Sequence, residues 1–275
     1  MDPALYAAPG PFTSLSTAQL ALVQRLDPDP VALCRSVQGL LVGPGDAAGA
    51  GLSEQRMSER NTRPASALLG RVLELDSARP LDQARPAELR VVGTCRHYAV
   101  LATAFLRAID VPARARCGFA AYFVPPKKVD HWIVEHWSED DQRWVRVDAE
   151  HVGRPTPAGA RCDDLADDEF LTAAEAWLLV RSGAEDASDF GVFGTANWGP
   201  GEIRGNAMRD LASLVAKVEM LPWDEWGPMA DSYEGRTGAD FDLLMDELAV
   251  ATRVGDQITL ERIYEQLAVP AASIA

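Results

Sequence analysis

The sequence predicts an α+β protein with a buried helix in the middle of the domain. Residues 95–109 are apolar almost all the way round a helix, whereas a surface helix would show one apolar stripe. Residues 113–124 fit a strand, and β-rich runs at 130–137 and 142–148 are separated by four turn-forming residues. The strand and hairpin predict an antiparallel sheet, and most other segments show helical periodicity.

Three helices are predicted before the central one. Residues 13–26 begin with capping residues, residues 29–42 follow two prolines, and residues 64–75 place leucines and a valine on one face. The Gly- and Ala-rich stretch 43–53 and the proline-containing stretch 76–88 are expected to be loops. We expect the N-terminal helices to cover one side of the core.

The central helix begins with a cysteine. Cys95 follows two valines and a glycine-containing turn, and Pro112 ends the helix. Unpaired N–H groups and the helix macrodipole favour negative charge at a helix N-terminus, and Arg96 adds positive charge. We therefore expect a lowered thiol pKa and a nucleophilic role for Cys95. The alternative is that Cys95 is a small buried hydrophobe, as free cysteines usually are.

The hairpin offers a base and an acid. If Trp137 pairs with Gln142 across the loop, His131 lies opposite Asp148 on the same face, about 5 Å away. The imidazole and the carboxylate then hydrogen-bond, and the carboxylate orients the ring. Cys95, His131 and Asp148 therefore have the residue types of a nucleophile–base–acid triad.

Other polar groups nearby are weaker candidates. His97 points about 200° around the helix from the thiol, and His136 and Asp130 alternate to the face opposite His131. Glu135 shares the face of His131 and is expected to support it. A lone Cys-x-His pair without a C-x-x-C motif does not make a zinc site, so we expect no metal and no cofactor.

The chain after the hairpin is predicted to be mostly helical. A loop at 151–168 is expected to expose Cys162, and residues 182–201 form a glycine-rich, aromatic loop of the kind that lines sites. The Trp-rich segment 221–227 either caps a substrate cleft or clamps the last helices to the core, and we favour the clamp. Helices are predicted at 170–181, 203–220, 240–253 and 256–267.

The motifs around these residues resemble those of the transglutaminase-like superfamily, over roughly residues 90–150. The segments that carry the resemblance are Gly93-Thr94-Cys95-Arg96, Leu106-Arg107-Ala108 and Val111-Pro112-Ala113-Arg114 for the nucleophile helix and its exit, His131-Trp132 with Glu135 for the histidine strand, and Trp144 with Val147-Asp148 for the Trp-to-Asp strand. The sequence departs from the family at His97, where members often carry Asp, and in having no tryptophan before residue 132.

The resemblance implies a papain-like α+β core and thiol acyl-transfer chemistry, by hydrolysis, transamidation or amide formation. Cys95 would form an acyl intermediate, with His131 as base and Asp148 as the residue that orients it. The implied substrates are peptides, proteins or small acyl and amine compounds. Side chains that are candidates for contacting the substrate are Tyr122, Trp132 and Trp198.

Two other functions remain open. The chain resembles a fold on which some proteins have lost the triad and bind DNA or proteins instead, which gives a non-catalytic binding protein as one alternative. The retained cysteine, histidine and aspartate and the acidic charge count against it. A dedicated amide-bond-forming enzyme of a small-molecule pathway is the other.

Composition limits the partners. The formal charge of −15, from 26 basic and 41 acidic residues, argues against nucleic-acid binding, which needs clustered Lys and Arg. No apolar run is long enough to span a membrane, the start lacks signal-peptide features, and four cysteines show no pairing pattern, so we expect a cytoplasmic protein. The oligomeric state stays open. One compact unit is expected, with a helical part at 1–89, a catalytic core at 90–150 and a helical extension at 151–275.

Overall fold

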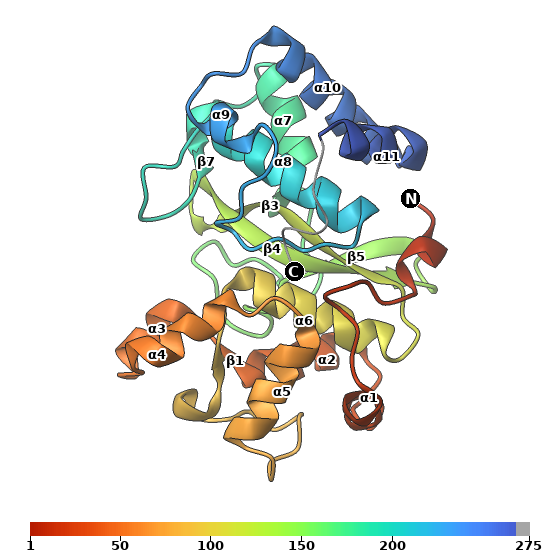
Figure 1. Cartoon of the computed structure of the whole chain (residues 1–275), viewed down its shortest axis with the longest axis vertical. Coiled ribbons are helices and arrows are strands. Elements are labelled where there is room, and N and C mark those ends of the chain that lie inside the picture. The colour runs from red at the N-terminus through yellow and green to blue at the C-terminus, as the bar shows by residue number, and fades with distance from the viewer. Residues whose placement is uncertain (268–275) are drawn as a thin grey trace.

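The computed structural model describes residues 1–267, which form a mainly antiparallel sheet between two layers of helices (Figure 1). The strand order is β5-β4-β3-β6, and β7 is added parallel to β4. The α+β class is confirmed, and β3 has both ends where the sequence predicts them. The strands are β3 (Ala113–Val124), β4 (Lys127–Ser138), β5 (Arg143–Val147), β6 (Phe170–Thr172) and β7 (Phe190–Gly191).

Helices from the first part of the chain cover one face of the sheet, and α6 (Cys95–Arg107) lies directly against it (Figure 1). All residues of α6 after Cys95 are buried, as expected for a helix that is apolar on every side. One core joins Leu33, Leu69, Phe105 and Val134. The helices around α6 are α1 (Thr17–Val23), α2 (Pro30–Leu40), α3 (Pro44–Gly49), α4 (Glu54–Met57) and α5 (Ala65–Leu75).

Helices from the last part of the chain cover the opposite face (Figure 1). Phe119 of β3 packs with Trp177, Met208 and Leu248 in a second core. The sheet continues beyond residue 150, because β6 pairs with β3 and β7 pairs with β4. The helices are α7 (Ala173–Arg181), α8 (Pro200–Val215), α9 (Met229–Tyr233), α10 (Ala239–Val254) and α11 (Gln257–Gln266).

Short elements connect these layers. A two-stranded parallel sheet pairs β1 (Leu41–Val42) with β2 (Val91–Val92), directly before α6. Single 3-10 turns are η1 (Pro3–Tyr6), η2 (Ser58–Asn61), η3 (Ala87–Leu89) and η4 (Ala187–Asp189).

The β4–β5 hairpin differs from the predicted register by two residues. Trp137 pairs with Trp144 rather than with Gln142, and β5 ends at Val147. Gln142 has a φ of 50° and therefore belongs to the turn instead of the strand. A shift of two residues leaves every side chain on its predicted face, whereas a shift of one would have reversed them all. Asp148 therefore lies just beyond the strand.

Other segments also differ from the predictions. The expected loop at 43–53 contains α3, because Pro44 occupies the first helical position and Asp46 lies in the first turn. The helix predicted at 170–181 begins only at Ala173, since the preceding residues pair with β3. The helix predicted at 203–220 runs from Pro200 to Val215. Cys162 is buried in an apolar cluster and does not face solvent.

Glu135 is not a partner of His131, contrary to the expectation. Its carboxylate binds the guanidinium groups of Arg114, Arg116 and Arg146 at 2.6, 2.9 and 3.3 Å. Burial alone would raise the pKa of Glu135, but the three arginines outweigh it and hold the pKa far below its usual range. Arg116 also pairs with Asp210 at 2.9 Å, which ties β3 to α8. This buried network is a structural connection between sheet and helix.

The Trp-rich segment packs against the last helix. Trp226 is buried and meets Tyr264 of α11 edge to face, with ring centroids 6.1 Å apart. This contact supports the clamp. Trp223 is 45% exposed, with the Arg60 guanidinium 5.6 Å from its ring centroid.

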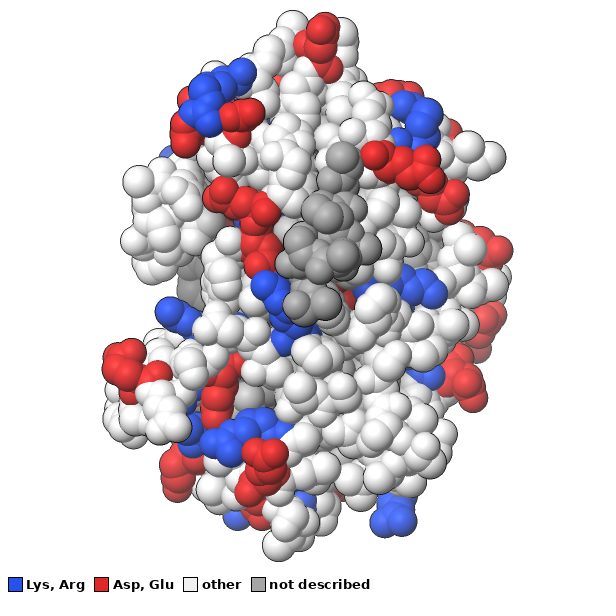
Figure 2. All heavy atoms as spheres, in the orientation of Figure 1, with Lys and Arg blue, Asp and Glu red and all other residues white. Residues whose placement is uncertain are grey.

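Acidic and basic side chains are interspersed on the face drawn in Figure 2. Oppositely charged side chains pair at the surface, as Arg262 does with Glu247. Among the described residues, no helix combines the length and the apolar character needed to cross a membrane.

Candidate active site

A short strand and a tight turn place Cys95 at the first position of α6. Strand β2 is held by β1, and the Gly93 N–H donates to the Val42 carbonyl at 3.0 Å. Thr94 caps the helix, and its N–H donates to Nδ1 of His97 at 3.0 Å. A Cβ at Gly93 would lie 2.8 Å from Cβ of His97, so only glycine fits this turn. The cap explains why His97 points away from the thiol, as predicted.

His131 lies beside Cys95, although 36 positions separate them in the chain. The sulfur of Cys95 and a ring nitrogen of His131 are within 4.8 Å of each other. A carboxylate oxygen of Glu150 lies within 4.8 Å of both atoms. Nε2 of His131 hydrogen-bonds Oδ2 of Asp148 at 3.0 Å. That bond leaves Nδ1 as the nitrogen available to the thiol. The three residues predicted as a triad are therefore brought together.

Asp148 is held by donors on both of its oxygens. Oδ2 accepts hydrogen bonds from the Tyr122 hydroxyl at 2.5 Å and from His131 and His151 at 3.0 Å each. Oδ1 accepts from the backbone N–H groups of Glu150 and His151 at 2.9 and 3.1 Å. The carboxylate is fully buried, and these partners outweigh its burial and lower its pKa. Asp148 is thus fixed as an anion.

The pKa values of the histidine and the thiol are both raised. Burial disfavours the imidazolium, but the neighbouring Asp148 carboxylate outweighs it and holds the pKa of His131 well above its usual value. Burial raises the pKa of the Cys95 thiol, although the hydrogen bond with His131 opposes the rise. The predicted lowering of the thiol pKa is therefore wrong. Deprotonation of the thiol depends on its histidine partner.

Arg96 does not act on the thiol either. Its buried guanidinium points toward the C-terminal part of the chain, where Nε donates to the Glu219 carbonyl at 2.8 Å and Nη1 to the Arg63 carbonyl at 2.6 Å. Burial lowers its pKa to about 10. The expectation that Arg96 supplies positive charge at Cys95 is wrong, because the side chain joins two segments of the fold.

A cavity of about 510 Å³ opens beside the sulfur. This volume lies in the range of small-molecule sites. Its walls combine apolar side chains with the polar groups Asp130, His131, Glu150 and His151. The apolar lining residues are Pro44, Phe123, Val124, Val129 and Phe193.

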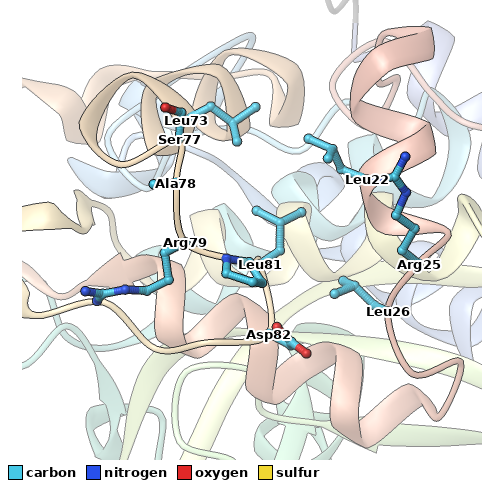
Figure 3. Close-up of a pocket in the computed structure, with 10 residues that line it drawn as sticks. Leu22, Arg25, Leu26, Leu73, Ser77, Ala78, Arg79, Leu81 and Asp82 are labelled. Atoms are coloured by element: carbon cyan, nitrogen blue, oxygen red, sulfur yellow. The ribbon is translucent and has the colours of Figure 1, made fainter.

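A second hollow, of about 350 Å³, lies between α1 and the loop after α5 (Figure 3). Leu22, Leu26, Leu73 and Leu81 line it, and neither Cys95 nor His131 does. It is separate from the candidate active site.

The three side chains predicted to contact the substrate lie away from the cavity walls. Tyr122 is buried beneath them and holds Asp148. Trp132 is also buried, in a cluster with Ala99 and Cys117 against which Cys95 packs. Trp198 covers Gly191 of β7 and lines a neighbouring cavity.

Sequence reasoning missed Glu150 and His151. Both line the cavity, and both follow Asp148 in the turn that replaces the end of the predicted strand. Had Asp148 been placed in a turn, an acid and a histidine two and three residues later would have been clear candidates.

Two groups of side chains have the spacing of metal ligands. Cys95, His131 and Glu150 form one, and His131, Asp148 and His151 form the other; within each group all ligand atoms lie within 4.8 Å of one another. They share His131, whose Nε2 bonds Asp148 of the second group.

Comparison with known proteins agrees with this geometry. Residues 73–149 match the family model of the transglutaminase-like superfamily, and the match includes Cys95, His131 and Asp148 but ends before Glu150. No curated protein and no solved structure matches the chain. The segment that carries the cysteine, the histidine and the aspartate is thus similar to the core of the transglutaminase-like superfamily.

Proposed function

We propose that the protein is a cysteine acyltransferase or amidohydrolase that forms a thioester between Cys95 and the acyl group of an amide or thioester substrate. The observation that carries the proposal is the order of contacts at the cavity: thiol beside imidazole, and imidazole bonded to a buried carboxylate. The family match supports it, because the superfamily is typically one of cysteine-based acyl transfer.

The chemistry needs two proton transfers through one ring nitrogen. The sulfur of Cys95 attacks the carbonyl carbon as the thiolate of a thiolate–imidazolium pair, in which Nδ1 of His131 holds the thiol proton. The tetrahedral intermediate collapses, the bond from carbon to the leaving amine or thiol breaks, and the imidazolium returns its proton to the departing group. Water or an amine then attacks the thioester while His131 accepts its proton. The sulfur leaves and the free enzyme is restored.

Asp148 stabilises the charged state that forms in each transfer. The carboxylate faces Nε2, so the imidazolium gains an ion pair at the moment when it holds the thiol proton. The thiol is partly buried and its pKa is raised, so the sulfur is a poor nucleophile without this partner. Removing either partner therefore impairs the nucleophile.

The start of α6 offers one donor for the developing oxyanion. The first N–H groups of a helix have no carbonyl partner four residues earlier, and Cys95 occupies the first position. We propose that its N–H donates to the oxygen of the carbonyl that the sulfur attacks.

The cavity indicates the kind of acyl group that fits. Phe123, Val129 and Phe193 form apolar walls near the sulfur, while Asp130 lies on the side toward α8. We propose a peptide, protein or small acyl donor with an apolar acyl portion, and water or an amine as acceptor.

Trapping of the acyl-enzyme tests the proposal. The protein is mixed with a library of peptide amides and acyl thioesters, quenched in acid and digested, and the Cys95 peptide is measured by mass spectrometry. We expect an added acyl mass on Cys95 and none on Cys117, which is buried in the same core and serves as an internal control. The adduct should disappear in Cys95→Ala. Absence of any adduct, while iodoacetamide still modifies Cys95, would contradict the proposal.

A further inference from the structure

The sulfur of Cys95 has a second neighbour that the acyl-transfer steps do not use. Glu150 lies in the turn after β5, and its carboxylate is within 4.8 Å of both the sulfur and a ring nitrogen of His131. The three ligand atoms come from a helix start, a strand and a turn, and they converge at the wall of the cavity. A thiolate, an imidazole and a carboxylate are the ligand types that bind zinc.

The spacing fits a tetrahedral ion after a small movement. Zinc–ligand bonds of about 2.0–2.3 Å place neighbouring ligand atoms about 3.3–3.8 Å apart. The ligand atoms of Cys95, His131 and Glu150 are at most 4.8 Å apart. Each pair therefore has to approach by at most about 1.5 Å to reach the spacing of a zinc site. His131 is buried and fixed, whereas Cys95 and Glu150 are only partly buried. The two partly buried side chains are therefore the ones that can adjust.

The surroundings of His131 match those of a metal-binding histidine. Such a histidine usually donates its second ring N–H to a carboxylate, which fixes the tautomer and the ring orientation. Nε2 of His131 bonds Asp148 in this way, and Asp148 is itself held by Tyr122 and His151. Nδ1 is thereby presented to the side where Cys95 and Glu150 lie.

Charge also favours a divalent cation here. The Glu150 carboxylate and the Cys95 sulfur lie within 4.8 Å of each other at the cavity wall, so a cation between them would be held by two ligands that are anionic when metal is bound. Thiolate and imidazole favour zinc over magnesium or calcium, which prefer oxygen ligands. The second group, formed by His131, Asp148 and His151, is less suited to zinc because it has no sulfur ligand. Oδ2 of Asp148 already forms hydrogen bonds with both histidines.

We propose that Cys95, His131 and Glu150 form a reversible zinc site that switches the nucleophile off. Three protein ligands leave the fourth position to a water molecule from the cavity. While zinc is bound, the sulfur cannot attack a carbonyl and Nδ1 cannot accept a proton. Glu150 supplies the third ligand beside Cys95 and His131, so its replacement should weaken zinc binding directly.

Cobalt and zinc titrations test the site without any substrate. Protein freed of metal with EDTA is titrated with Co²⁺, and a thiolate-to-cobalt charge-transfer band reports the sulfur ligand. Zinc affinity is measured by competition with a chromogenic chelator. Glu150→Gln keeps the shape of the side chain, and Glu202→Gln is the matched control because Glu202 is a buried acid that lines a different cavity.

We expect one zinc ion per chain, a charge-transfer band that is lost in Cys95→Ser, and at least about tenfold weaker zinc binding in Glu150→Gln with no change in Glu202→Gln. Zinc should also protect Cys95 from iodoacetamide until EDTA is added. It should raise the thermal unfolding midpoint of the wild type and of Glu202→Gln more than that of Glu150→Gln.

Equal zinc affinity in the two glutamine variants, or no charge-transfer band in the wild type, would overturn the site. The thermal unfolding of the metal-free variants shows that both are folded. Because these measurements need no acyl donor, the zinc site and the acyl transfer can fail independently of each other.

Discussion

The hydroxyl of Tyr122 donates to Oδ2 of Asp148 at 2.5 Å, and the same oxygen accepts the hydrogen bond from Nε2 of His131. Tyr122 lies on β3, His131 on β4, and Asp148 in the turn after β5. The contact therefore connects three consecutive parts of the sheet below the candidate active site. It explains how a residue outside the regular strands can hold a histidine in a fixed orientation.

Tyr122→Phe should lower the free energy of unfolding by about 1.5–3 kcal/mol, the value of a hydrogen bond to a charged group. It should also slow alkylation of Cys95, because His131 loses part of the support for its carboxylate partner. Urea unfolding and the rate of iodoacetamide labelling measure the two effects. Tyr264→Phe is the matched control, since the buried Tyr264 hydroxyl has no hydrogen-bond partner among the described residues. A loss of stability as large in the control would contradict the assignment to the Asp148 contact.

Asp148→Asn should reduce stability by up to about 3–5 kcal/mol, because it leaves His131 buried without its counter-charge. The raised pKa of His131 stabilises the fold fully below the unfolded value of 6.5, and this contribution is lost as pH rises through the folded pKa. The lowered pKa of Asp148 stabilises the fold above 3.8, and that contribution is lost as pH falls through the folded pKa. The difference between wild type and variant should therefore be largest between about pH 4 and 6.5.

Urea unfolding of both proteins from pH 3 to pH 9 measures that difference. A difference in stability that does not vary over this range would show that the pair is not ionised in the folded protein.

Gly93→Ala should disturb the turn that places Cys95. The added Cβ would lie 2.8 Å from Cβ of His97, so the cap of α6 has to move. Overpacking of this kind typically costs about 1–3 kcal/mol, and we expect slower labelling of Cys95 as well. Gly45→Ala is the control, because a Cβ there meets no atom within 4 Å and the residue lies in α3. Equal stability of the two variants would contradict the tight fit at Gly93.

Much of the site could be predicted from the sequence because the strongest patterns were local. The all-round apolar run after Cys95 gave the buried helix, and alternation gave β3 with both of its ends. His131 and Asp148 were predicted to bond even though the hairpin register was wrong. A shift of two residues preserves the faces of a strand, so the error did not separate them.

What could not be predicted depends on contacts between distant segments. The guanidinium of Arg96 reaches a carbonyl at Glu219, 123 positions away, instead of the neighbouring thiol. Burial raises the pKa of Cys95, and the depth of burial is set by the packing of β3 and β4 on α6. Glu150 reaches the sulfur only because the chain turns at Asp148, which periodicity does not reveal.

The most direct test of the central claim is the rate at which iodoacetamide alkylates Cys95 at pH 6, compared between wild type and His131→Ala by intact-mass and peptide mass spectrometry. Cys34, Cys117 and Cys162 are buried and serve as internal controls. We predict rapid modification at Cys95 alone in the wild type. In His131→Ala the rate should fall, because the thiol loses the hydrogen bond that opposes its raised pKa. An unchanged rate in His131→Ala would contradict the pairing of thiol and imidazole on which the account depends.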